Sequence, residues 1–250
     1  MGNWFNKVIR NATRIKGLYK VNLGFCPICQ SRTVFIAVDK WLRDNYCCIK
    51  CLSIPRQRAV VKVVSGLRAK NVEMMVHESS PSGPASSFFK DSFKNYSSSQ
   101  YLPETQCGSC HNGVRCENLE ALTFEDNEFD LFITQDVMEH VFNPEKAFSE
   151  IARVLKPKGM YIFTVPYSRD NEQTEFRAKM KENVIDYIKE PQYHKNPVDP
   201  DGSLVTVDYG RDLPRLINEW SGLYTTIYRT IDKYYGLDGE FIDVFVSEKL

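Results

Sequence analysis

The sequence predicts an α/β fold with an open, mostly parallel sheet, preceded by a small cysteine-rich module. Three observations support this prediction. From residue 72 onward, short apolar runs alternate with segments that have helical periodicity. Within residues 130–166 a strand, a helix and a second strand follow one another, which is the βαβ unit of parallel sheets. Ahead of residue 72, two Cys-x2-Cys pairs lie between residues 26 and 51.

Five apolar runs are the predicted strands of the sheet. They are residues 72–78, 130–137, 160–166, 224–231 and 241–249. The runs at 130–137 and 160–166 are apolar almost throughout, which indicates strands buried on both faces. A helix is predicted between these two, with Asn143 as its N-cap, Pro144 at its first position and Pro157 beyond its end. In such sheets ligands bind beyond the carboxyl ends of the strands.

The whole chain divides into four predicted segments. Residues 1–25 read as a basic helix and connector, and residues 26–53 hold the cysteine module. Residues 54–71 carry apolar positions at helical spacing and are predicted to be a connecting helix. Residues 72–250 form the sheet domain. Within it, residues 193–210 contain three prolines and little periodicity, which predicts a long loop suited to substrate contact.

Composition and charge limit the classes of partner. The chain has 250 residues, and its 32 Lys and Arg residues balance 32 Asp and Glu residues. This balance argues against nucleic acid and against an anionic membrane surface as partners. No apolar run approaches the roughly 20 residues needed to span a bilayer, and the N-terminus has no apolar signal core. We therefore expect a cytoplasmic protein whose eight cysteines are thiols or metal ligands rather than disulfides.

Four of the cysteines have the spacing of a structural zinc site. They are Cys26, Cys29, Cys48 and Cys51. Two such pairs, 18 residues apart, can present four thiolates tetrahedrally to Zn²⁺ in a zinc ribbon, with no coordination position left open. The alternative is a set of unpaired core cysteines. Cys47 is spare, and Cys107, Cys110 and Cys116 with His111 form either a second metal site or, as we favour, a polar loop.

Residues 117–166, "ENLEALTFEDNEFDLFITQDVMEHVFNPEKAFSEIARVLKPKGMYIFTVP", resemble the second half of a class I S-adenosylmethionine-dependent methyltransferase, more narrowly the type 11 branch. The resemblance covers roughly residues 72–250. It implies a Rossmann-like seven-stranded sheet whose last hairpin strand is antiparallel. The cysteine module is similar to a front end found on some methyltransferases near polysaccharide-biosynthesis genes.

The resemblance also implies where S-adenosylmethionine binds. The turn after the first strand, "ESSPSG", would hold the methionine part, and the next strand end and the residues around 117 would hold ribose and adenine. This turn keeps one glycine where the family has several, and serines and prolines take the other places. The implied cofactor residues are Glu78, Ser79, Ser80, Gly83, Gln100, Glu117, Asn118, Leu119, Gln135 and Asp136. Taken singly, each has an alternative reading as a solvated or structural polar group.

The same resemblance implies that Glu139 and His140 lie near the side of the cofactor from which the methyl group is transferred. Methyl transfer needs alignment and, for a hydroxyl acceptor, a group that removes a proton. Candidate bases are His140 and His194, because both have pKa values naturally near neutrality, and Glu139 is a further choice. Packing against the following helix is an equally good reading of His140.

The predicted function is methyl transfer to a small-molecule or glycan acceptor, on oxygen or nitrogen. Two alternatives stay open. A nucleic-acid methyltransferase could use the zinc module for recognition, supported by the basic N-terminus and by "IPRQRAVVK" but opposed by the zero net charge. A catalytically inactive binding module could keep the fold without the cofactor, as the altered turn would allow.

Overall fold

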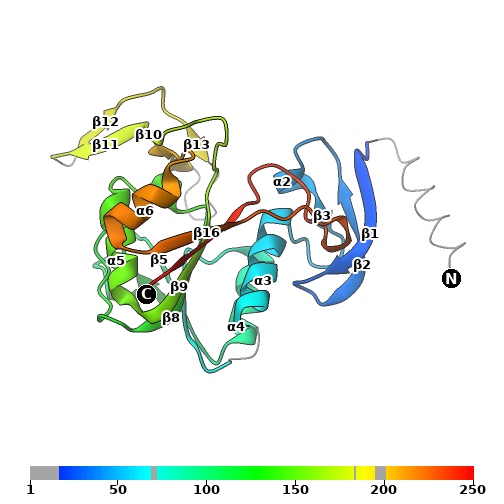
Figure 1. The fold of residues 1–250 in the computed structure, drawn as a ribbon, viewed down its shortest axis with the longest axis horizontal. Helices are drawn as coiled ribbons and strands as arrows, with labels where there is room; N and C mark the ends of the chain where they lie inside the picture. Colours follow the sequence, from blue (N-terminus) through cyan, green and yellow to red (C-terminus); the bar gives the residue numbers. More distant parts are fainter. Residues whose placement is uncertain (1–16, 69–71, 183, 195–200) are drawn as a thin grey trace, which may run out of the picture. The chain divides into compact units, whose positions relative to one another are not determined.

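The computed structural model describes residues 17–68, 72–182, 184–194 and 201–250, and these residues form two compact units. The ribbon unit contains the described residues up to Val72 together with Ser82–Lys94 and Tyr228–Val244. The sheet unit contains Glu73–Pro81, Asn95–Ile227 and Phe245–Leu250. Figure 1 shows the chain coloured by sequence. The helix predicted within residues 1–25 falls mostly outside the described residues.

The cysteine module is a three-stranded antiparallel ribbon. Strand β1 (Lys20–Cys26) pairs with β2 (Ser31–Ala37) over its whole length, and β3 (Cys47–Cys48) pairs with β2. Along β2 every second side chain is buried, so one face of the hairpin is packed. Each Cys-x2-Cys pair includes the end of a strand and the turn that follows. The ribbon predicted around "TVFIAV" is therefore present, and a short helix α2 (Leu42–Asn45) joins β2 to β3.

Two longer helices complete the ribbon unit. The predicted connecting helix is α3 (Pro55–Arg68), which begins at a proline, where a missing N–H costs no intrahelical hydrogen bond. Helix α4 (Gly83–Ser92) also has a proline in its first turn. It buries Ala85 and Phe89.

A segment near the C-terminus belongs to the ribbon unit, which the sequence analysis did not foresee. Residues 228–244 include the 3-10 helix η2 (Lys233–Tyr235) and lie against β1. The side chain of Asn22 donates to the carbonyl oxygen of Lys233, and Lys20 pairs with Asp238. A Cβ on Gly24 would overlap the carbonyl oxygen of Tyr234, so only glycine permits this close approach.

The sheet unit is built on an eight-stranded sheet of order β16-β17-β9-β8-β4-β5-β7-β6. Its strands are β4 (Met75–Ser79), β5 (Asn95–Gln100), β6 (Cys110–His111), β7 (Val114–Cys116), β8 (Phe129–Gln135), β9 (Leu155–Thr164), β16 (Tyr224–Tyr228) and β17 (Val244–Glu248). Strands β4, β5, β7, β8 and β9 are parallel, and β17 is antiparallel to β9. This confirms the predicted Rossmann-like sheet with its reversed strand. The eighth strand, β6, is an added edge hairpin with β7.

Helices α5 (Pro144–Val154) and α6 (Leu213–Ser221) lie side by side in the sheet unit (Figure 1). The predicted N-cap is confirmed, because the side chain of Asn143 accepts the N–H of Lys146 at 3.0 Å. Beneath the helices the core is aromatic, with the rings of Tyr161 and Phe163 stacked 4.5 Å apart. No described helix combines the length and the apolar character that a membrane span requires.

The loop predicted over residues 193–210 is partly wrong. The chain here forms β13 (Tyr193–His194), β14 (Ser203–Leu204) and β15 (Val207–Asp208), while residues 195–200 lie outside the described residues. Strand β13 pairs with β14, and β15 pairs with β10 (Glu175–Phe176). A further hairpin joins β11 (Ala178–Lys181) to β12 (Val184–Tyr187). Two-residue strands carry too few side chains to produce a readable alternation.

A histidine is buried in the centre of the sheet. His77 in β4 has no exposed surface, and its Nδ1 and Nε2 atoms lie 2.8 and 2.9 Å from the hydroxyl oxygens of Ser97 and Ser99. Three aromatic rings pack around its imidazole, those of Phe124, Phe129 and Phe132. Burial, and then the charge of Arg115, lower the pKa of His77 to about 3. The ring is therefore neutral in the folded protein.

Acid is expected to destabilise the sheet unit through His77. In the unfolded chain this ring gains a proton near its ordinary pKa of 6.5, whereas in the folded chain it does so only near 3. Its contribution is present above pH 6.5 and is lost as the pH falls toward 3. Between pH 7 and pH 5 we expect a loss of about 2 kcal/mol in the free energy of unfolding. Denaturant unfolding should show a smaller loss for His77→Gln, whereas exposed His111→Gln should match the unchanged protein. Equal pH dependence in all three would contradict this account.

Candidate functional site

The four cysteines predicted as metal ligands converge in the ribbon unit. Their sulfur atoms all lie within 4.8 Å of one another. The Sγ atoms of Cys26 and Cys51 are 3.6 Å apart, and those of Cys29 and Cys48 are 3.9 Å apart. Four sulfurs bound tetrahedrally to zinc at about 2.3 Å would lie about 3.8 Å from one another. The cluster is therefore compatible with a zinc ion.

Hydroxyl groups surround the sulfur cluster. Ser31, Thr33 and Ser53 each place a hydroxyl oxygen between 3.2 and 3.4 Å from a sulfur of the cluster. The hydrogen bond with the Cys26 thiol, followed by that with Thr33, lowers the pKa of Cys48 to about 4. Hydrogen bonds to a thiolate favour the charged form that binds metal.

A buried arginine stands beside the cluster and was missed by the sequence analysis. Arg58 in α3 has no exposed surface, and its guanidinium donates to the carbonyl oxygens of Tyr46 and Gly236, both at 2.8 Å, and of Ser53. The guanidinium carbon lies 4.5 Å from the ring centre of Phe35. Burial lowers the pKa of Arg58 to about 10, and the cluster's thiolates oppose this effect. Arg58 is therefore charged at neutral pH.

The other cysteines are not members of this cluster. Cys47 is half-buried, and its sulfur lies 3.9 Å from the carbonyl oxygen of Asp44. Cys116 is buried, Cys107 is half-buried and Cys110 is exposed. All are free thiols, and they do not gather with other ligand types into a metal-sized group in the described ranges. The favoured reading of 107–116 as a polar loop is partly wrong, because Cys110–His111 and Val114–Cys116 form the β6–β7 hairpin.

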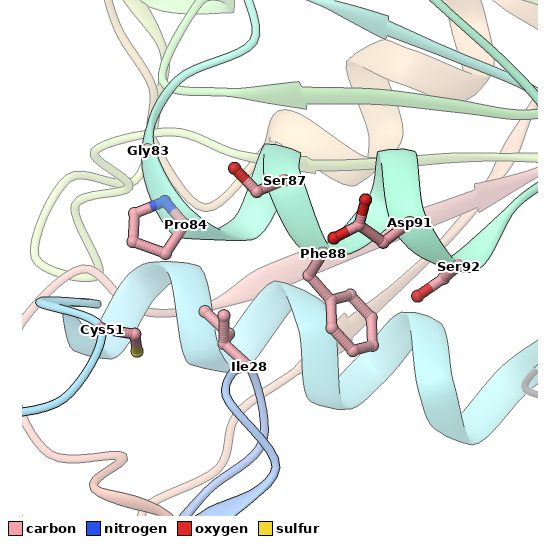
Figure 2. A pocket seen from close by; sticks show the side chains of 8 residues that line it. All are labelled: Ile28, Cys51, Gly83, Pro84, Ser87, Phe88, Asp91 and Ser92. Carbon is pink, nitrogen blue, oxygen red and sulfur yellow. The ribbon is translucent and has the colours of Figure 1, made fainter.

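Gly83, predicted to bind cofactor, lies at the start of α4 in the ribbon unit. It has a φ of +70°, and a Cβ there would overlap Nε2 of Gln57, so the amide of Gln57 fills the neighbouring space. Gly83 also lines a shallow groove of about 800 Å³ between the cysteine loops and α4, and the side chains of Ile28 and Phe88 also line it (Figure 2). The remaining predicted cofactor residues belong to the sheet unit.

Glu78 lies at the carboxyl end of β4, where the prediction placed the first acidic group. Its side chain is buried, and its two oxygens accept hydrogen bonds from the hydroxyl of Tyr96 at 2.7 Å and from Nε2 of Gln135 at 3.1 Å. Burial and the Glu78 charge raise the pKa of Tyr96. The Tyr96 hydroxyl therefore stays protonated and donates a hydrogen bond to Glu78. The structure thus brings Glu78 and Gln135 together across the neighbouring strands β4 and β8.

The turn after β4 begins in a left-handed backbone conformation. Ser79 is buried, and Ser80 has a φ of +57° while its N–H donates to the carbonyl oxygen of Ser99 at 2.8 Å. A residue other than glycine rarely adopts this conformation, so the turn is strained at the position where the family has glycine. Asp136, after β8, has the same conformation, with a φ of +54°, and accepts the hydroxyl of Thr164 at 2.9 Å.

Gln100 and Glu117 lie on adjacent strand ends, as predicted. The N–H of Glu117 donates to the carbonyl oxygen of Gln100 at 3.2 Å. The buried carboxylate of Glu117 accepts hydrogen bonds from Arg115 at 2.7 Å and from the hydroxyl and N–H of Thr123 at 2.5 and 2.9 Å. Leu119 is buried in the core, and Asn118 caps the N–H of Glu120 at 2.9 Å. Glu117 Oε2, with one hydrogen bond, has acceptor capacity left.

The three candidate catalytic side chains meet in the sheet unit. Glu139 and His140 lie in the 3-10 helix η1 (Met138–His140), and His194 lies in β13. Glu139 Oε1 is 3.8 Å from Nε2 of His140 and 3.7 Å from Nδ1 of His194, and the two imidazole rings are 5.3 Å apart. This convergence brings together residues that are 54 positions apart in sequence.

Residues 204–209 hold this cluster in place. Thr206 donates its N–H, at 2.8 Å, and its hydroxyl, at 3.0 Å, to the carbonyl oxygen of Glu139. The hydroxyl of Tyr209 donates to the carbonyl oxygen of Met138 at 2.9 Å, and Nδ1 of His140 lies 2.8 Å from the carbonyl oxygen of Leu204. Sequence patterns gave no signal for these contacts, because they depend on how 203–209 folds back onto η1.

The strand order and the antiparallel β17 define a class I methyltransferase sheet. Residues 94–163 match a family described as "Methyltransferase domain". This match overlaps most of residues 117–166 and confirms the resemblance inferred from them.

Curated relatives are similar over shorter parts of the chain. The glycine/sarcosine/dimethylglycine N-methyltransferase of Actinopolyspora halophila is 29% identical over 126 residues, which are 45% of this chain and 22% of that protein. The ubiquinone/menaquinone biosynthesis C-methyltransferase of Hydrogenovibrio crunogenus is 52% identical over 45 residues, 18% of each chain. The chain thus spans about a fifth of the length of these relatives.

Solved structures with a similar arrangement include an S-adenosylmethionine-dependent methyltransferase from Mesorhizobium loti. It has a TM-score of 0.49 and 10% identity, and the match covers 76% of this chain and 98% of that one. A Burkholderia thailandensis 1,6-didemethyltoxoflavin-N1-methyltransferase, with 1,6-didemethyltoxoflavin and S-adenosylhomocysteine bound, has a TM-score of 0.43 and 11% identity. That match covers 76% of this chain and 78% of the other.

Proposed function

We propose that this chain is an S-adenosylmethionine-dependent methyltransferase of the cytoplasm that acts on a small-molecule or glycan acceptor. One observation carries the proposal. The polar side chains implied by the family stand, in the family's order, at the carboxyl ends of four neighbouring parallel strands, β4, β5, β7 and β8. The methyltransferase match to residues 94–163 and relatives named for small-molecule methylation support it.

The residues at this edge fit the chemistry of the cofactor. S-adenosylmethionine supplies an electrophilic methyl group on a sulfonium, together with an ammonium, a carboxylate, ribose hydroxyls and an adenine amine. Glu78 and Glu117 supply buried acceptors for the cationic and N–H or O–H groups. Ser79 and Ser80 supply hydroxyl donors, and Gln100 supplies an amide for the ribose.

Residues of the chain would then align the acceptor and manage its proton. Methyl transfer is an in-line displacement, so most of its acceleration comes from positioning. The acceptor's lone pair forms the new bond to carbon while the carbon–sulfur bond breaks and its electron pair stays on sulfur. Glu139, His140 and His194 form the candidate group that receives the acceptor's proton. At the ribbon, the proposed zinc ion is structural, since four thiolates leave no coordination position for a substrate.

Calorimetric titration of S-adenosylhomocysteine into the zinc-loaded protein tests the proposal. We expect micromolar binding, weakened about tenfold or more in Glu117→Gln, because a hydrogen bond to a charged group is lost. Exposed Glu125→Gln is the matched control and should bind as the unchanged protein does. Circular dichroism of each variant checks that the fold persists.

A non-catalytic binding module is the second candidate function. It is favoured by the engaged carboxylate of Glu78 and by the packing of Gly83 against Gln57. No binding of S-adenosylhomocysteine at millimolar concentration would favour this module over the enzyme.

A further inference from the structure

Three electron-pair donors face one another at the candidate catalytic cluster without a hydrogen bond among them. The side chain of Glu139 is only 1% exposed, and neither of its carboxylate oxygens has a hydrogen-bond partner in the described part of the chain. A buried carboxylate without partners is costly, because burial removes its hydration and nothing replaces it. A positive charge beside Glu139, carried by a proton or by a metal ion, would offset this cost.

The surroundings of His140 decide which of its nitrogens carries a proton. Its Nδ1 lies 2.8 Å from the carbonyl oxygen of Leu204, and a carbonyl oxygen can only accept. Nδ1 must therefore hold a hydrogen, and in the neutral ring Nε2 presents a lone pair toward Glu139 Oε1, 3.8 Å away. Nδ1 of His194 faces the same oxygen at 3.7 Å.

Either protons or a metal ion could stabilise these facing atoms, and the distances favour the metal. An imidazolium hydrogen-bonded to a carboxylate closes to about 2.7–2.9 Å. Two ligands on one tetrahedral ion, with bonds of about 2.1 Å, lie about 3.4 Å apart. The separations of 3.7 and 3.8 Å are nearer the second value, and all three ligand atoms lie within 4.8 Å of one another.

We propose that Glu139, His140 and His194 bind a divalent transition-metal ion, separate from the zinc ion proposed at the cysteines. Two imidazole nitrogens and one carboxylate suit the series from Mn²⁺ to Zn²⁺ better than Mg²⁺ or Ca²⁺, which prefer oxygen alone. The hydrogen bond from His140 to Leu204 is the outer contact that metal-bound histidines usually make.

Three protein ligands leave coordination positions open, and this gives the acceptor a chemical class. Resting on the proposed methyl transfer, the inference is that the acceptor binds the ion through a hydroxyl oxygen. Coordination would lower the pKa of that hydroxyl. Because the lone pairs of Glu139, His140 and His194 would hold the ion, these residues would not receive the acceptor's proton, which would pass to solvent water. The oxygen lone pair would then attack the methyl carbon as the carbon–sulfur bond breaks. The predicted substrates are therefore hydroxyl compounds.

Manganese binding to the zinc-loaded protein tests the metal site. Mn²⁺ prefers oxygen and nitrogen ligands, so it should leave the cysteine-bound zinc in place. Electron paramagnetic resonance should show one bound Mn²⁺ per chain, and Glu139→Gln should weaken binding by at least about tenfold. Exposed Glu145→Gln is the matched control and should bind as the unchanged protein does. After dialysis in buffered zinc, elemental analysis should give two zinc ions per chain, but one for Glu139→Gln.

The outcomes separate this inference from the proposed function. Binding of S-adenosylhomocysteine without a second metal ion would overturn the metal site and leave the methyltransferase standing. Suppose instead that a second metal ion binds, that Glu139→Gln loses it, and that S-adenosylhomocysteine does not bind. This result would leave the metal site standing and overturn the methyltransferase. For the open positions, catechol is the oxygen-donor probe. It should displace manganese-bound water and lower the water-proton relaxation rate, and an unchanged rate would overturn the hydroxyl acceptor.

Discussion

Replacing Cys48 with serine is expected to unfold the ribbon. Strand β3 has only two residues, and a hairpin such as β1 with β2 is marginal in water without further support. Structural zinc sites in small domains contribute about 10–16 kcal/mol at neutral pH, as much as the whole stability of a typical protein. Loss of one thiolate from the cluster removes most of this contribution.

Cys47→Ser provides a matched control for this experiment. It makes the same replacement of sulfur by oxygen at the adjacent residue of the same strand, but the sulfur of Cys47 is not part of the cluster. Limited trypsin digestion should cut Cys48→Ser within residues 20–50 and leave Cys47→Ser intact there. A strong zinc chelator should make the unchanged protein behave as Cys48→Ser does. Equal protection of both variants would contradict a structural metal in the ribbon.

The sequence was sufficient for the main features of both units. Residues 130–137 and 160–166 could be predicted as buried parallel strands because their apolar runs lack alternation. The helix between them was readable from Asn143 and Pro144, since capping is a local interaction. The cluster of four cysteines was readable for the same reason, because each pair is fixed by its own turn.

Features that depend on long-range contacts were not predictable. The attachment of 228–244 to β1 joins segments about 200 residues apart. In the sequence, Gly24 is the one sign that another backbone segment approaches β1 closely. His77 was not singled out, because its burial depends on the hydroxyls of Ser97 and Ser99 in the next strand. The three members of the candidate catalytic cluster were named individually, but their convergence depends on the pairing of β13 with β14.

Replacing Arg58 with methionine is expected to lower the free energy of unfolding by about 3–5 kcal/mol. This is the usual effect of removing one member of a buried pair of opposite charges. A zinc ion with four thiolates carries a net charge of −2 (+2 − 4), and Arg58 is the buried cation beside it. Its guanidinium also satisfies the carbonyl oxygens of Tyr46, Ser53 and Gly236, which methionine would leave unpaired.

A charge-conserving variant separates the two contributions of Arg58. Arg58→Lys keeps the positive charge but cannot reach three carbonyl oxygens from one planar group, so we expect an intermediate loss of stability. Zinc affinity, measured by competition with a chromogenic chelator, should fall for Arg58→Met and be largely retained for Arg58→Lys, because both Arg and Lys place a positive charge beside the thiolates. Exposed Arg32→Met, in β2 of the same unit, is the control for loss of an arginine. If Arg58→Met proved as stable and as tightly zinc-bound as Arg32→Met, the buried guanidinium would have no role in holding the cluster, and the folding of α3 onto the ribbon would need a purely apolar explanation.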